Sequence, residues 1–192
     1  MLTSDHVPPA CLFSKPRPSD LVTVPCCSSC NREFMKDDEY FRIAVTTGID
    51  KVKFPRENAD SVHAINKLVR PQSFGFARRV LQGVDLDTDC FFHDRGRLDI
   101  VLRRISRGLF YYHKGERMPA TVHFEFVLLT PSMRISTAGQ EQISRLEGNL
   151  RTIGQGVFRY TFEPFEAPDP FGTAWLMRFY DNQAFFCITS SE

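Results

Sequence analysis

The sequence lacks several features that would assign it quickly to a class of protein. Its 192 residues contain no internal repeat and no glycine-rich loop of the kind that cradles phosphates. No apolar run is long enough to cross a membrane, since the longest, 124–129, is interrupted by Glu125. No secretory signal is present either, so we expect a cytoplasmic protein whose six cysteines serve metal binding rather than disulfides.

The sequence also lacks an excess of charge of one sign. It has 24 Lys and Arg against 23 Asp and Glu, and a net charge of +1 gives no overall attraction to nucleic acid. A local field is expected between Arg95 and Arg117, where the periodicity predicts an amphipathic helix. The side of this helix opposite its apolar arc gathers Arg97, Arg103, Arg104 and Arg107. These arginines are expected to contact DNA phosphates or, as the simpler alternative, to form a solvated surface.

The N-terminal segment combines residue types that suit metal-assisted cleavage of a phosphodiester. His6 can serve as a base near neutral pH, and Asp5 and Asn31 offer oxygen ligands for magnesium or manganese. Composition predicts a strand over 21–24, and a helix from Asn31, acting as its N-cap, through Val45.

Each of these residues also has a purely structural explanation. His6 could be an exposed histidine near a terminus, Asp5 a turn former and Asn31 a plain helix cap. The acidic run 37–39 is expected to be a solvated helix face.

The order of these motifs resembles the HNH endonuclease family, whose ββα-metal module places Asp-His on its first strand and Cys-x-x-Cys-Asn before its helix. The resemblance covers roughly residues 1–45. It implies that His6 is the general base and that Asp5 and Asn31 hold the catalytic divalent ion. Asp20 stands where the family usually has an asparagine that orients the loop carrying the histidine.

The resemblance also implies a structural zinc site, of which this chain holds half. Many members carry two Cys-x-x-Cys knuckles that bind zinc with four thiolates. Here only Cys27 and Cys30 are present, and five residues precede His6, so we expect that the start is misassigned or truncated. A redox pair is the competing explanation for the two cysteines. Cys11, in an apolar patch, is expected to pack in the core rather than to bind zinc.

The remaining chain predicts an α+β fold, with an HNH-like ββα-metal module at 1–57 and a mixed α/β domain of unknown role at 58–192. Period-two alternation predicts an antiparallel sheet, and helical spacing predicts the helices. The expected strands are 122–128, 158–162, 175–179 and 185–189, and the expected helices are 58–69, 74–81 and 143–153. The predicted function is a metal-dependent endonuclease acting on DNA. The alternative is a catalytically inactive module that binds nucleic acid or protein.

Overall fold

The computed structural model describes residues 2–48, 50–68, 74–82, 84–85, 90–91, 93–165 and 168–191. Helices and antiparallel sheets make up the chain, so the predicted α+β class is confirmed. The elements are β1 (Leu2–Val7), the 3-10 turn η1 (Ala10–Leu12), β2 (Val22–Cys27), α1 (Ser28–Glu33), α2 (Met35–Thr46), α3 (Pro55–Leu68), α4 (Phe74–Leu81), β3 (Val84–Asp85), β4 (Cys90–Phe91), α5 (Arg95–Lys114), β5 (His123–Leu129), α6 (Thr137–Glu147), β6 (Arg151–Ile153), β7 (Phe158–Pro164), β8 (Thr173–Phe179) and β9 (Gln183–Ser190).

The main sheet has five antiparallel strands in the order β5-β9-β8-β7-β6. The four strands predicted in the C-terminal part of the chain correspond to β5, β7, β8 and β9, although β5 begins at His123 and not at the predicted residue 122. The strand predicted over 21–24 corresponds to part of β2, which begins at Val22 and belongs to the N-terminal hairpin. On β8, Trp175 points to the face that also carries Phe162, and the two rings stack with centroids 4.4 Å apart. Ala174 and Leu176 are buried against the opposite face.

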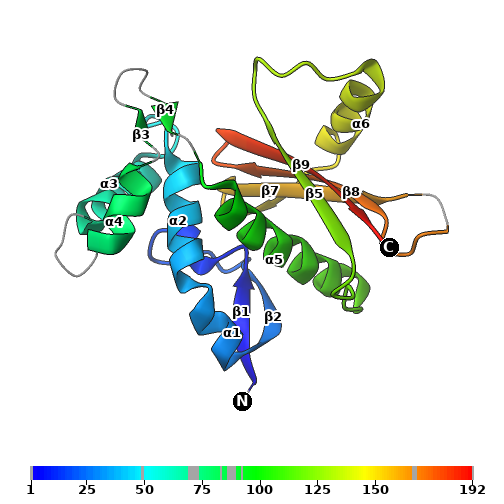
Figure 1. The fold of residues 1–192 in the computed structure, drawn as a ribbon, viewed down its shortest axis with the longest axis horizontal. Coiled ribbons are helices and arrows are strands. Elements are labelled where there is room, and N and C mark those ends of the chain that lie inside the picture. The colour runs from blue at the N-terminus through cyan, green and yellow to red at the C-terminus, as the bar shows by residue number, and fades with distance from the viewer. Residues whose placement is uncertain are drawn as a thin grey trace.

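Helix α5 lies between this sheet and the N-terminal hairpin of β1 and β2 (Figure 1). Asp94 caps its start and Gly115, in the left-handed conformation, ends it. The side chains of the predicted apolar arc are all buried, namely those of Leu98, Val101, Leu102, Ile105 and Leu109. These side chains join the hairpin and the sheet into one hydrophobic core, so α5 is the element that positions the hairpin.

Helix α6 covers the other face of the sheet, where Leu146 packs against β8. The predicted helix 143–153 was wrong in its second half, because the helix ends at Glu147 and Ile153 lies in β6, paired with Phe158. The turn that follows contains Gly154, which has a positive φ of 63°. The apolar residues after Glu147 keep the spacing of a helix, but residues 151–153 form a strand because they pair with β7.

The helices of the middle segment are close to their predicted ranges. Helix α4 spans the predicted 74–81, whereas α3 starts three residues before the predicted 58 and runs to Leu68. Residue 69, the last of that predicted helix, lies outside the described residues. The expected boundary between 57 and 58 falls inside α3.

Within the described ranges, none of the helices combines the length and the apolar character that a membrane span requires.

Candidate functional site

The N-terminal hairpin and the helix after it follow the order strand, strand, helix. In the hairpin, Asp5 lies opposite Val24 and His6 opposite Thr23. Because neighbouring side chains of a strand point to opposite faces, Asp5 and His6 face different sides of the hairpin. The Asp5 side meets α5, since Arg104 binds Asp5 and Gly108, one turn further along, approaches Val7. His6 therefore points away from α5.

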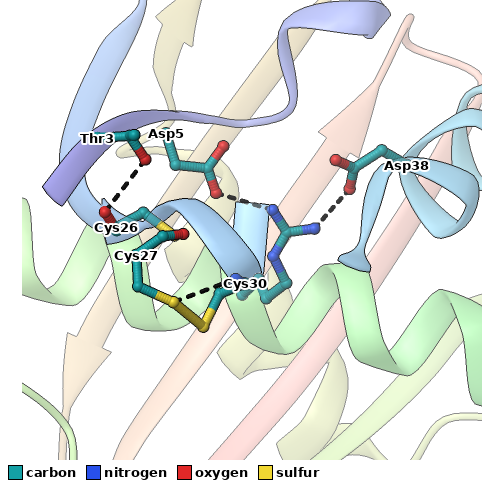
Figure 2. Close-up of polar contacts among 7 residues, drawn as sticks. Thr3, Asp5, Cys26, Cys27, Cys30 and Asp38 are labelled. Atoms are coloured by element: carbon teal, nitrogen blue, oxygen red, sulfur yellow. Dashed lines mark hydrogen bonds and ion pairs between the residues drawn. A yellow bond between two sulfur atoms is a disulfide. The ribbon is translucent and has the colours of Figure 1, made fainter. Parts of the chain in front are cut away.

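Asp5 is held by an ion pair. Its Oδ2 accepts a hydrogen bond of 2.7 Å from Arg104, whose other terminal nitrogen donates to Asp38 Oδ1 at 2.6 Å. Figure 2 shows the two carboxylates on either side of this guanidinium group. The three side chains are only 15–19% exposed, and the guanidinium also lies 4.5 Å from the centre of the Phe34 ring. The planar group is thus fixed from three sides.

Burial perturbs the acidity of this cluster. It raises the pKa of Asp38 from 3.8 to about 6, even though Arg104 acts in the opposite direction. The nearby carboxylates Asp5 and Asp37 raise it further. The pKa of Arg104 is raised, because the attraction of Asp38 and Asp5 outweighs desolvation. One arginine therefore neutralises two acidic groups from different elements.

The acidic run 37–39 was predicted to be a solvated helix face, and that prediction was wrong for two of its members. Asp37 accepts a 2.7 Å bond from Arg97, and Asp38 pairs with Arg104. Residues 97 and 104 stand two turns apart on α5, so α2 and α5 are joined by paired charges along their contact. Sequence reasoning missed these partners because periodicity shows how side chains are spaced around a helix, and not which other helix they meet.

Asn31 lies within α1, and its predicted role as the N-cap was wrong. The helix begins at Ser28, and the cap is Cys27, whose Sγ accepts a 3.1 Å bond from the N–H of Cys30. The expected single helix is also divided at Phe34 into α1 and α2. Asn31 lines a hollow of about 290 Å³ beside Thr3, whereas Asp5 lines a different pocket of about 370 Å³. These two proposed metal ligands are not brought together.

Cys27 and Cys30 form a disulfide at the start of α1 (Figure 2). Zinc binds thiolates, so this bonded pair and a zinc brace are mutually exclusive states of the same two residues. Cys26 is a free thiol beside them. Among the residues that the structure describes, no group of three or more His, Cys, Asp or Glu side chains is placed to hold a metal ion.

Asp20 binds a turn of the main sheet that is distant in the sequence. Its carboxylate accepts bonds of 3.0 and 3.2 Å from the N–H of Gly154, in the turn between β6 and β7. A side chain at Gly154 would meet the ring of Phe13 at 2.3 Å, so the turn packs closely on the loop that carries Asp20. Asp20 thus orients this loop relative to the main sheet.

His6 is half-buried, and its Nδ1 has no hydrogen-bond partner among the described residues. A buried polar atom without a hydrogen-bond partner carries a free-energy cost. Of the expected catalytic residues, His6 is the one with a buried polar atom that has no hydrogen-bond partner in the described part of the chain.

The arginine face of α5 is largely occupied by contacts within the chain. Arg97 and Arg104 are ion-paired, while the guanidinium groups of Arg103 and Arg107 lie 5.4 and 5.3 Å from the centre of the Phe124 ring. Arg107 also donates to the carbonyl groups of Pro119 and Ala120 at 3.2 Å. Desolvation lowers the pKa of Arg107, with Arg103 as a second cause.

No family model matches the chain, and neither the curated proteins nor the solved structures include one that matches it.

The residues implied as metal ligands do not fit a divalent ion in the arrangement described. A ligand set needs two or more oxygen donors converging on one point. Here Asp5 is directed at Arg104, and Asn31 belongs to a separate hollow. The site as it stands consists of two carboxylates bound by one arginine, and of an imidazole whose Nδ1 is buried without a partner among the described residues.

Proposed function

We propose that this chain is an HNH-like module that binds nucleic acid without cutting it. The expectation that the module does not cut nucleic acid rests on one observation, the ion pair of 2.7 Å between Arg104 and Asp5. A carboxylate that is paired with a guanidinium group has its charge already balanced, and releasing Asp5 would leave this largely buried carboxylate without its counter-charge. The nucleic-acid part of the proposal comes from the resemblance of the N-terminal motifs to the HNH family.

A second candidate is the metal-dependent endonuclease, and His6 is the observation that favours it. The imidazole lies on the strand where the family has its general base, with Nδ1 unpartnered in the described part of the chain. In this candidate His6 takes the proton of the attacking water. Asp5 must first leave Arg104, and the chain must bring Asn31 toward the same side of the hairpin. The divalent ion, magnesium or manganese, would be held only in that rearranged state.

A plasmid-nicking assay separates the two candidates. The full chain is incubated with supercoiled plasmid and magnesium or manganese, with His6→Ala as the matched control. The binding module is expected to leave the plasmid intact in both proteins while still retarding it on a gel. Metal-dependent nicking by the wild type that His6→Ala abolishes would overturn the binding-only proposal in favour of the endonuclease.

We also propose that the chain works in the cytoplasm and that Cys27 and Cys30 are half of a zinc brace there. In a reducing compartment the disulfide would open and supply two thiolates. Elemental analysis of protein purified under reducing conditions should find zinc in the wild type and none in the Cys27→Ser variant. Protein without zinc, carrying an intact disulfide after thiol alkylation and mass analysis, would refute the brace.

A further inference from the structure

A groove with many cationic side chains lies away from α5, between the loop that joins β1 to β2 and the first turns of α3. It consists of two hollows of about 510 and 530 Å³. Both are lined by Phe13, Ser14, Arg17 and Arg56, so they are adjacent. We call this feature the basic groove, and its cationic residues are Lys15, Arg17, Arg42, Lys53 and Arg56, with His63 at one end.

Most of these charges are not neutralised by the protein. Lys53 pairs with Asp181, but Lys15, Arg17 and Arg56 are exposed and form no ion pair within the described ranges. Of the residues that the structure describes, the acidic ones in the lining are Glu57 and Asp60. Because the whole chain has a net charge of +1, this concentration of free positive charge is a local feature.

Arg42 adds a further positive charge to the groove. It stands on α2 and lines the groove, and it forms no ion pair among the described residues. Its Nε is buried and lies out of reach of a ligand, so Arg42 acts on an anion in the groove through its charge. Arg56, in the first turn of α3, donates to the carbonyl of Lys15 and so fixes the loop across the groove.

We propose that the basic groove binds the phosphodiester backbone of a nucleic-acid strand. Guanidinium and ammonium groups are the side chains that contact phosphates, and two adjacent hollows with cationic linings suit successive phosphates better than one compact anion. The N-terminus of α3, which opens onto the groove, adds a favourable dipole. This inference rests on the proposed function and assigns it a surface other than the arginine face of α5.

The test compares two double variants with matched loss of charge. Lys15→Gln/Arg17→Gln removes two exposed groove cations, and Lys114→Gln/Arg134→Gln removes two exposed cations outside the groove. Fluorescence anisotropy measures binding of each full-length protein to a labelled single strand of about 20 nucleotides, longer than the site of one small domain. Titrations at several salt concentrations give the salt slope, and urea midpoints check that both variants fold.

The groove variant is expected to bind about tenfold more weakly, with the salt slope reduced by about 0.7 for each phosphate that the variant no longer neutralises. The control variant should match the wild type. Equal loss of affinity in the two variants would overturn the groove while leaving nucleic-acid binding in place. Absence of binding by the wild type would overturn the proposed function and the groove together. Inorganic phosphate that competes as strongly as the strand, at equal ionic strength, would show a compact anion site and overturn the strand.

Discussion

At the scale of single residues, Arg104 holds two carboxylates that come from different elements. It connects β1 to α2 through two carboxylates, and it does so from a position on α5 where its side chain is 19% exposed. Without it, Asp5 and Asp38 would face each other with no counter-charge.

Replacement of Arg104 by Met should therefore destabilise the protein by about 2 kcal/mol, between the values for exposed and fully buried pairs. Urea unfolding gives the difference. The control is Arg103→Met, whose exposed guanidinium lies over Phe124 and should cost less than about 1 kcal/mol. Equal losses would mean that the two carboxylates do not depend on Arg104.

The pKa of Asp38 predicts a pH dependence of stability. Since burial raises it from 3.8 to about 6, the folded protein keeps a proton on Asp38 that the unfolded chain releases. The contribution of Asp38 to the free energy of unfolding is therefore greatest below about pH 4 and is lost as the pH rises to about 6. Asp38→Asn lacks this change, so urea midpoints of the two proteins should diverge across this interval and run parallel above it. Parallel curves throughout would contradict the shift.

At the scale of elements, the close approach of α5 to β1 depends on a glycine. A Cβ at Gly108 would lie 2.6 Å from Cγ2 of Val7, a side chain buried in the core. Gly96, in the first turn of the same helix, has only an ordinary contact of 3.5 Å with Asp94. Substitution of Gly108 therefore tests how closely α5 packs on β1, whereas substitution of Gly96 tests the helix propensity of α5.

Gly108→Ala should cost about 1–3 kcal/mol, because Val7 or the helix has to move. Gly96→Ala should be neutral or stabilising by up to about 0.5 kcal/mol, because alanine favours the helix. Thermal unfolding followed by circular dichroism measures both. A stabilising Gly108→Ala would show that the hairpin does not pack on α5 as described.

The elements that could be predicted from the sequence are those in which apolar residues recur at one regular spacing. The apolar arc of α5 repeats every three or four residues, and β8 alternates around Trp175, so both were identified. The segment 143–153 failed because Leu150 and Ile153 also fit helical spacing, and only pairing with β7 makes Ile153 part of a strand.

The candidate site was less predictable, since it depends on contacts between distant segments. Asp5, His6 and Asn31 were expected to meet at one site once the chain folds back as a hairpin, but strand alternation alone separates the first two. That Asp5 meets Arg104 follows from how α5 packs on the hairpin, which no local pattern contains. The basic groove was missed for the same reason, because its cations come from a loop, from α2 and from α3.

At the scale of the whole molecule, the N-terminal segment and the sheet share one core. Phe41 of α2 meets Phe179 of β8 edge to face, with centroids 5.0 Å apart. Gln183 donates to the carbonyl of Ala44, and Asn182 to that of Thr47. These contacts cross the expected boundary at 57/58, so we expect residues 1–57 and 58–192 to unfold together.

Urea unfolding of the full chain should therefore give one transition. Fluorescence of Trp175, the single tryptophan, reports on the sheet, and far-ultraviolet circular dichroism reports largely on the helices. Phe41→Ala should cost about 3–5 kcal/mol and move both curves equally. Separate midpoints for the two probes, or a shift in only one of them, would show two independent units.

The hydrogen bond from the hydroxyl of Tyr180 to the carbonyl of Leu12 joins residues that are 168 positions apart. Synthesis proceeds from the N-terminus at roughly 5–20 residues per second, so the hairpin emerges from the ribosome many seconds before β8 and β9 exist. During that time its apolar residues have no sheet to pack against. The hairpin thus waits for its partners in the sheet while the intervening chain is made, and during that time its apolar residues are open to proteases, chaperones and wrong partners.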